Sequence, residues 1–237
     1  MESLKGVVFD MDDTLYPENA YVQSGFRAVS IWLSTHGWVQ EEQAFEFLWR
    51  GHLEERRGNT FDSLMEAFPG LNHVTELPEL VQIYREHPPV IAMFPAMEAL
   101  LKALKTKGIP TALISDGRHA VQTRKIAALG LQDLIDEIFL TDTWGSNFWK
   151  PHQRAYQEAE QALRLHASDL VYVADNPLKD FQTPKALGWR TLWAAFPERV
   201  HIYTGAEPGT TALAKTPQEA ADLLLNWLHL GKGALPR

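Results

Sequence analysis

The stretch Gly6-Val7-Val8-Phe9-Asp10-Met11-Asp12-Asp13-Thr14-Leu15 lies near the N-terminus and decides the fold. Apolar residues that favour strands run directly into three carboxylates, which is the pattern of a buried strand that ends in charged residues. Open α/β sheets bind ligands at the carboxyl ends of their strands. Because side chains alternate along extended backbone, we expect Asp10 and Asp12 to project to the same side. A solvated acidic turn is the alternative interpretation.

The residues that follow this stretch have the spacing of helices. From Tyr16 to Phe94 the apolar residues recur three and four positions apart, and no strand is apparent. We expect helical runs at about 22–36, 41–57, 61–68 and 77–87. The sequence therefore predicts a helical domain at 16–94, inserted into a core formed by 1–15 and 95–237.

From Pro95 onward, strand and helix patterns alternate. Further strands are expected at 110–114, 137–141, 170–174 and 190–194, with helices between them. Five strands separated by helices predict an α/β fold with a Rossmann-like, doubly wound parallel sheet. Residues 196–215 are expected to be mainly loop, with a short strand or loop at His201-Ile202-Tyr203, before a last helix that begins at Thr216. We expect residues 231–237 to fray.

Composition narrows the class of protein. Among 237 residues, 45% are hydrophobic and 22% are charged, which is an ordinary globular balance. The net charge is -8 and there is no long block of Lys or Arg, so we expect neither a nucleic-acid partner nor a membrane partner. The absence of cysteine excludes disulfides and thiol catalysis. With no signal-peptide core and no membrane-spanning run, we expect a soluble cytoplasmic protein; its oligomeric state stays open.

Polar residues follow the later strands or lie in the loops between them: Ser115 with Asp116 and Gly117, then Lys150, then Asp175 with Asp180. The hydroxyl of Ser115 and the amides of the next two residues could hold phosphate oxygens. Each of these residues alone is more often a helix cap or a solvated side chain. Their order at successive strand ends predicts one ligand site.

Two neighbouring aspartates suit nucleophilic catalysis. A free aspartate has a pKa near ~3.9, so Asp10 would be ionised at neutral pH and available as a nucleophile. Asp12 could work as a general acid if its neighbour's charge raises its pKa, and then as a base in the next step.

This constellation resembles the haloacid dehalogenase superfamily of phosphohydrolases. The D-x-D-x-T motif of that family stands here as Asp10-Met11-Asp12-Asp13-Thr14. Ser115 matches the second motif, and Lys150 followed by proline matches the third. The acidic fourth motif stands as Ala174-Asp175-Asn176-Pro177-Leu178-Lys179-Asp180, with Ala in place of the usual Gly.

The resemblance implies a role for each of these residues. Asp10 would attack phosphorus to form an aspartyl-phosphate, and Asp12 would protonate the leaving alcohol and then activate water. Lys150 would neutralise the phosphate, and Ser115 would bind one of its oxygens. The implied cofactor is Mg²⁺, with ligands from the Asp10 and Asp175 side chains and the Asp12 carbonyl, and with Asp180 outside them.

Within the family, Asp12 separates the alternatives. The dehalogenases lack an aspartate there, and the ion-pumping ATPases carry threonine, so Asp12 favours a phosphatase or a phosphomutase. The implied substrate is a small phosphorylated metabolite such as a sugar phosphate, a nucleotide or phosphoglycolate. A catalytically silent binding or scaffold protein is the rival from another class.

The helical insertion resembles a cap that closes over small substrates. Five of its residues are candidates to reach the leaving group: Asn19, Tyr21, Arg50, Arg56 and Arg57. The mixed charge run at 54–57 is more typical of a solvated helix face. Beside Lys150, aromatic side chains could wall the site or simply pack: Trp144, Phe148 and Trp149.

Overall fold

The computed structural model describes residues 4–55, 58–197, 199, 200, 203, 205 and 208–230. The chain divides into two compact units, which we call the core unit and the helical unit. The core unit comprises 1–19 and 92–237, and the helical unit comprises 20–91. The sequence placed these divisions after residue 15 and before residue 95.

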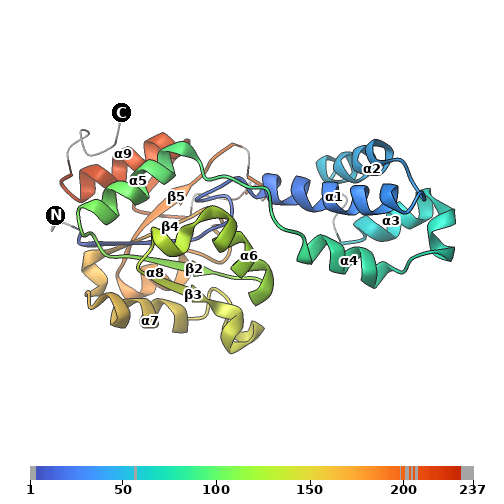
Figure 1. Ribbon diagram of the computed structural model, residues 1–237. Helices are drawn as coiled ribbons and strands as arrows, with labels where there is room; N and C mark the ends of the chain where they lie inside the picture. Colours follow the sequence, from blue (N-terminus) through green and yellow to red (C-terminus); the bar gives the residue numbers. More distant parts are fainter. Residues whose placement is uncertain are drawn as a thin grey trace. The chain divides into compact units, whose positions relative to one another are not determined.

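The core unit is built on one six-stranded parallel sheet in the order β3-β2-β1-β4-β5-β6 (Figure 1). Its strands are β1 (Gly6–Phe9), β2 (Thr111–Ser115), β3 (Glu137–Leu140), β4 (Leu170–Ala174), β5 (Arg190–Ala194) and β6 (Ala212–Ala214). Strand β1 is central, and Phe9 pairs with Leu113 of β2 and Val173 of β4. This register brings the residues that follow β1, β2 and β4 to the same edge of the sheet.

Helices cover both faces of the sheet. They are α5 (Pro95–Thr106), α6 (His119–Leu129), α7 (Arg154–Leu163), α8 (Gln182–Leu187) and α9 (Pro217–Trp227). Helices α5 and α9 lie side by side on one face, and α7 lies on the other (Figure 1). Val8 and Tyr172 point to the α7 face, where they share an apolar cluster with Tyr156. Burial on both faces explains why the strands are apolar runs without polar alternation.

The helical unit has its own apolar core. It contains most of α1 (Glu18–Thr35) together with α2 (Glu41–Leu53), α3 (Thr60–Ala67), the 3-10 turn η1 (Pro69–His73) and α4 (Leu77–Glu86). Phe26, Leu48 and Leu80 belong to one buried cluster. Helices α1 and α4 approach closely, since a Cβ atom on Gly25 would lie 2.4 Å from the Tyr84 ring. The four predicted helices are confirmed, although α2 ends at Leu53.

The predicted α/β class and parallel sheet are confirmed, but one strand was missed. Residues 212–214 were expected to be loop, whereas they form β6 and pair with β5 at the sheet edge. A strand of three residues is too short to show a periodic pattern. The expected elements at His201-Ile202 and 231–237, and Arg56 and Arg57 of the second helical run, lie outside the described residues. In the part of the chain that is described, no helix has the length and apolarity needed to cross a bilayer.

Candidate active site

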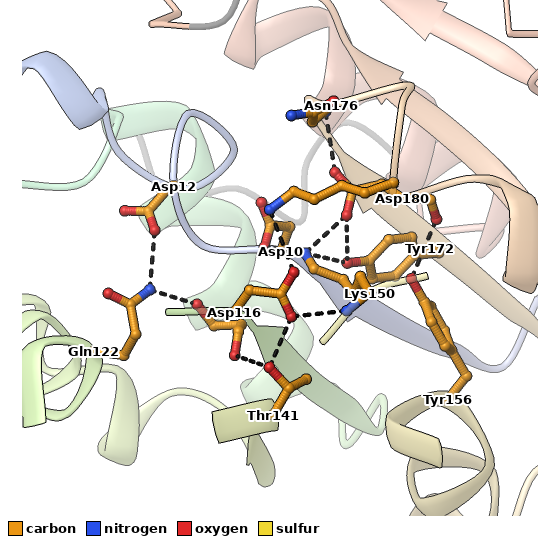
Figure 2. Close-up of polar contacts among 12 residues, drawn as sticks. Asp10, Asp12, Asp116, Gln122, Thr141, Lys150, Tyr156, Tyr172, Asn176 and Asp180 are labelled. Atoms are coloured by element: carbon orange, nitrogen blue, oxygen red, sulfur yellow. Dashed lines mark hydrogen bonds and ion pairs between the residues drawn. The ribbon is translucent and has the colours of Figure 1, made fainter. Parts of the chain in front are cut away.

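The first aspartate of the N-terminal stretch lies in a buried charge cluster at the carboxyl edge of the sheet (Figure 2). Asp10 follows β1, and its Oδ1 atom lies 2.6 Å from the Nζ atom of Lys150. The same ammonium lies 2.8 Å from Asp180 Oδ1 and donates a 3.1 Å hydrogen bond to the hydroxyl of Tyr172. Lys150 therefore ties the end of β1 to the loop that follows β4.

Asp10 and Asp175 hold protons more tightly than free aspartates do. Burial raises the pKa of Asp10 to about 6, against the opposing charge of Lys150 and with a contribution from Asp180. Burial and the charges of Asp10 and Asp180 raise the pKa of Asp175 well above its usual value. Burial disfavours the charged form of Lys150, but Asp10 and Asp180 outweigh it and raise the lysine pKa. The cluster therefore carries an excess of carboxylates.

Three of these carboxylates could hold a metal ion. One oxygen each from Asp10, Asp175 and Asp180 lies within 4.8 Å of the others, and all three residues are buried. Hard cations such as Mg²⁺ prefer carboxylate oxygens. Burial is the largest cause of the raised pKa values of Asp10 and Asp175, and a bound cation would offset it by stabilising the ionised carboxylates. The residues present therefore fit a divalent cation.

Asp12 lies in the same part of the core unit, and its carboxylate contacts a different set of side chains from that of Asp10 (Figure 2). Its Oδ1 atom lies 2.7 Å from Lys125 Nζ and accepts a hydrogen bond from the Tyr16 hydroxyl. Its Oδ2 atom accepts a 3.0 Å hydrogen bond from Gln122 Nε2. Burial acts to raise the pKa of Asp12, but Lys125, Tyr16 and Gln122 outweigh it and lower the pKa.

The sequence made a general-acid role of Asp12 conditional on a pKa raised by the charge of its neighbour. That condition is not met in this structure, because three donors from other parts of the chain stabilise the ionised form of Asp12. The side chains of Asp10 and Asp12 share one cavity, but they contact different cations.

The last residue of β2 and the two residues after it form the start of a turn, and hydrogen bonds hold Ser115 and Asp116 in place. Ser115 is buried, and its Oγ atom accepts a 2.8 Å hydrogen bond from Gln122. The Asp116 carboxylate accepts hydrogen bonds from the Thr141 hydroxyl (2.7 Å) and the Lys150 amide (3.1 Å). Gly117 has a φ of +115°, and a Cβ atom there would lie 3.3 Å from the Gln122 side chain, so the turn requires glycine.

A cavity of about 390 Å³ opens beside this cluster. It is lined by Asp10, Asp12, Glu18, Asp116, Gly117, Trp149, Lys150, Asp175, Asn176 and Lys179. Six of the eight predicted site residues line it, and the two that do not are Ser115 and Asp180. Both are buried, and the Asp180 carboxylate contacts Lys150 and accepts a hydrogen bond from the Asn176 amide. Trp149 lines the cavity, as the sequence allowed. Trp144 and Phe148 instead pack against the Arg154 guanidinium.

The candidate cap residues have mixed positions. Tyr21 is buried in the helical unit, where its ring packs against Tyr84 and His87 at 5.8 and 5.1 Å between centroids. Arg50 is an exposed residue of α2, and Asn19 belongs to the core unit. Arg56 and Arg57 lie outside the described residues.

Sequence reasoning missed several polar residues of the site, which are Tyr16, Glu18, Gln122, Lys125 and Lys179. A signal for two of them is present in the sequence. Gln122 and Lys125 fall on the same helical stripe as Ile126 and Leu129, which is the buried face of α6. A glutamine and a lysine on an apolar stripe indicate a buried polar contact. Lys179 lies inside the fourth motif, and its Nζ atom is 3.5 Å from Asp116.

Comparison with known proteins identifies the family. Residues 7–194 match the model for the haloacid dehalogenase-like hydrolases. The chain belongs to this family of hydrolases. The match spans both units and every motif that the resemblance used, so the family resemblance seen in the sequence is confirmed.

Proteins similar to this chain include a phosphatase and a dehalogenase. A glyceraldehyde 3-phosphate phosphatase of Methanocaldococcus jannaschii is 28% identical over 197 residues, covering 80% of this chain and 84% of the relative. The (S)-2-haloacid dehalogenase H-109 of Pseudomonas putida is 25% identical over 95% of this chain and 100% of the relative. A family hydrolase of Deinococcus radiodurans R1 with bound phosphate and sodium has a TM-score of 0.62 at 18% identity, covering 98% of each chain. That last likeness shows the shared fold.

Proposed function

We propose that this haloacid dehalogenase-like hydrolase is a Mg²⁺-dependent phosphomonoester hydrolase that acts on a small phosphorylated metabolite through an aspartyl-phosphate intermediate. The observation that carries the proposal is the pair of aspartates in one cavity. Asp10 contacts Lys150, and Asp12 is held on a separate set of donors. A nucleophile and a second carboxylate that can transfer a proton are the two groups that ester hydrolysis by this route requires.

The reaction divides into two displacements at phosphorus. An Asp10 oxygen forms a bond to phosphorus while the bond from phosphorus to the alcohol oxygen breaks. Asp12 gives a proton to that oxygen, and because its pKa is lowered in this structure, it must take up this proton before the alcohol departs. Asp12 then accepts a proton from water, whose oxygen bonds to phosphorus as the Asp10–phosphorus bond breaks. Lys150 offsets the negative charge of Asp10, and Ser115 with the amides of Asp116 and Gly117 would bind the phosphate oxygens.

Asp10 and Asp175, with the carbonyl of Asp12, would hold Mg²⁺, and Asp180 would orient Lys150 from outside. The ion, when bound, supplies positive charge that a carboxylate facing a phosphate dianion needs. Two like charges about 4 Å apart repel by roughly 4 kcal/mol at an effective dielectric near 20. The acidic cluster and its raised pKa values support this assignment.

Asp12 also favours a phosphatase over a dehalogenase, although relatives of both kinds match the chain. Breaking a carbon–halogen bond releases a halide ion, which needs no proton, whereas an alcohol leaves well only when it is protonated. The contacts of Lys125, Gln122 and Tyr16 with Asp12 support a working carboxylate at this position.

The test is release of inorganic phosphate from a panel of sugar phosphates, nucleotides, glyceraldehyde 3-phosphate and phosphoglycolate, with Mg²⁺ and with chelator. We expect release that chelator abolishes and that Asp10→Asn removes. Interconversion of sugar-phosphate isomers without phosphate release would instead establish a phosphomutase. Halide release from a 2-haloacid would establish a dehalogenase, and no turnover in any arm would favour the silent binding protein.

A further inference from the structure

Three side chains from two segments converge on the Asp12 carboxylate. Tyr16 follows the N-terminal motif, while Gln122 and Lys125 lie one turn apart on α6. Their exposed fractions are 0%, 2% and 3%, so water is excluded from these contacts. A buried lysine or glutamine is costly unless its polar atoms are satisfied, and Asp12 is the shared acceptor.

None of these three residues lines the cavity that holds Asp10 and Asp12. Lys125 contacts Asp12 without lining the cavity, in contrast to Lys150, which lines the cavity and contacts Asp10. The hydrogen bonds described for these three residues reach the cavity lining through Asp12, and Gln122 also contacts Ser115.

Gln122 also determines the hydrogen-bonding role of the Ser115 hydroxyl, because it donates a hydrogen bond to that oxygen. A carboxylate oxygen only accepts hydrogen bonds, so the atom of Gln122 that faces Asp12 is the amide nitrogen. The second hydrogen of that nitrogen goes to Ser115 Oγ at 2.8 Å. Because Ser115 Oγ accepts this bond, its own hydrogen is free to point at another acceptor, such as a phosphate oxygen.

We infer that Lys125, supported by Tyr16 and Gln122, is the positioning residue that fixes the Asp12 carboxylate for proton transfer to the leaving alcohol. This inference rests on the proposed function. The three donors leave the carboxylate few orientations, and a proton donor must stay within hydrogen-bond reach of the atom that it protonates. Lys125 thereby serves the departure of the alcohol, whereas Lys150 serves the attack by Asp10.

The experiment compares two phosphate esters whose leaving groups differ in their need for protonation. p-Nitrophenol leaves as a stable anion, whereas the alcohol of an alkyl phosphate must be protonated. The ratio kcat/KM reports the steps up to alcohol release, so it is measured for p-nitrophenyl phosphate and for the best alkyl ester of the panel. For Lys125→Met we expect a loss of about 100-fold with the alkyl ester and roughly threefold or less with p-nitrophenyl phosphate.

Two variants keep the test valid if Lys125→Met fails to fold. Tyr16→Phe removes only one hydroxyl, and we expect the same selectivity with a loss of about 10-fold for the alkyl ester. Lys102→Met is the matched control, because it removes an exposed lysine–carboxylate pair with Glu98 on α5, and both esters should react as with wild type. Thermal unfolding of each variant reports whether it folds.

Two further measurements separate positioning from other roles. If Lys125 acts through Asp12, adding Lys125→Met to Asp12→Asn should cost little more activity with either ester. Inhibition by inorganic phosphate should be unchanged in Lys125→Met, since Lys125 does not line the cavity. Equal losses with both esters in folded variants, additive losses in the double variant or weaker phosphate inhibition would each overturn the inference. Absence of wild-type phosphate release would instead overturn the proposed function.

Discussion

The surroundings of Asp10 and Asp12 differ in the balance of charge. Around Asp10, three buried carboxylates lie close together and Lys150 contacts two of them. Around Asp12, one carboxylate is met by an ammonium, a phenol and an amide. The pKa of Asp10 is accordingly raised by burial to about 6, while the pKa of Asp12 is lowered despite burial.

This difference explains why two aspartates two residues apart would do different work. The Asp10 side has more negative charge than its own cations offset, so it suits a site that gains a metal ion and a phosphate. The Asp12 carboxylate already has three hydrogen-bond donors from the protein, so its orientation is fixed before a substrate binds. Changes on the two sides should therefore have different kinetic signatures.

The largest expected effect is that of Asp10→Asn. Loss of the nucleophile should reduce phosphate release about 10⁴-fold or more for every ester, whatever its leaving group. Steady-state assays with p-nitrophenyl phosphate and an alkyl ester measure this. Asp133→Asn, an exposed aspartate after α6, is the matched control and should be fully active. A folded Asp10→Asn variant with wild-type turnover would refute the assignment of the nucleophile.

Asp12→Asn should have a smaller and more selective effect. We expect a loss of about 100- to 10,000-fold with an alkyl ester, because general acid catalysis typically contributes that much. With p-nitrophenyl phosphate the first displacement should persist, so rapid-mixing assays should show a burst of p-nitrophenol followed by slow turnover. The burst reflects phosphate trapped on Asp10 when no base activates water. Equal impairment with both esters and no burst would remove the distinction between the two aspartates.

The stabilisation of the protein by a bound metal ion should depend on the carboxylates around Asp10 and not on the Asp12 side chain. Mg²⁺ at about 100 times its Kd should add about 2.7 kcal/mol to the free energy of unfolding, which raises Tm by roughly 5 °C or more in a chain of this size. Asp175→Asn should remove this shift, since Asp175 belongs to the acidic cluster. Asp12→Asn should retain it, because asparagine keeps the backbone carbonyl. Calorimetry with Mg²⁺ and with chelator measures both, and a shift that survives Asp175→Asn would place the metal elsewhere.

The sequence predicted the Asp10 side well because its residues follow strands. Asp10, Ser115 and Asp175 come directly at or after the ends of buried apolar runs, and parallel pairing brings those ends together. Lys150 was recognisable from the motif order, although its contact with Asp180 was not. The roles given to these residues stay predictions until they are tested.

The Asp12 side was not predictable in the same way. Gln122 and Lys125 lie 110 and 113 residues from Asp12 along the chain and come from the middle of a helix. Nothing in local spacing relates a helical lysine to a distant loop, so only the polar residues on the buried stripe of α6 gave a signal. The direction of the Asp12 pKa shift depends on these contacts, so the effect of the Asp10 charge alone could not give it. Strand β6 was missed for another reason, its length of three residues.

Glu18 provides the smallest test, through the dependence of stability on pH. It lines the cavity, and burial together with the charge of Asp12 raises its pKa to about 8 from 4.5. Between those values the folded state holds a proton that the unfolded state has released, so stability falls as pH rises, by no more than about 1.4 kcal/mol per pH unit. Glu18→Gln should lose this slope, and its stability relative to wild type should increase from pH 5 to pH 8 in urea titrations.

Glu66→Gln, an exposed glutamate of α3, is the control and should keep the wild-type slope. Asp12→Asn links this test to the comparison of the two aspartates. Removing the Asp12 charge takes away one cause of the raised Glu18 pKa, so the slope should end at a lower pH in that variant. Burial remains as the first cause, so the slope should not vanish. If the pKa of Glu18 is the same in Asp12→Asn as in wild type, then Lys125 already offsets the charge of Asp12 at the position of Glu18. The charge of Asp12 would then have no influence on the groups that line the cavity.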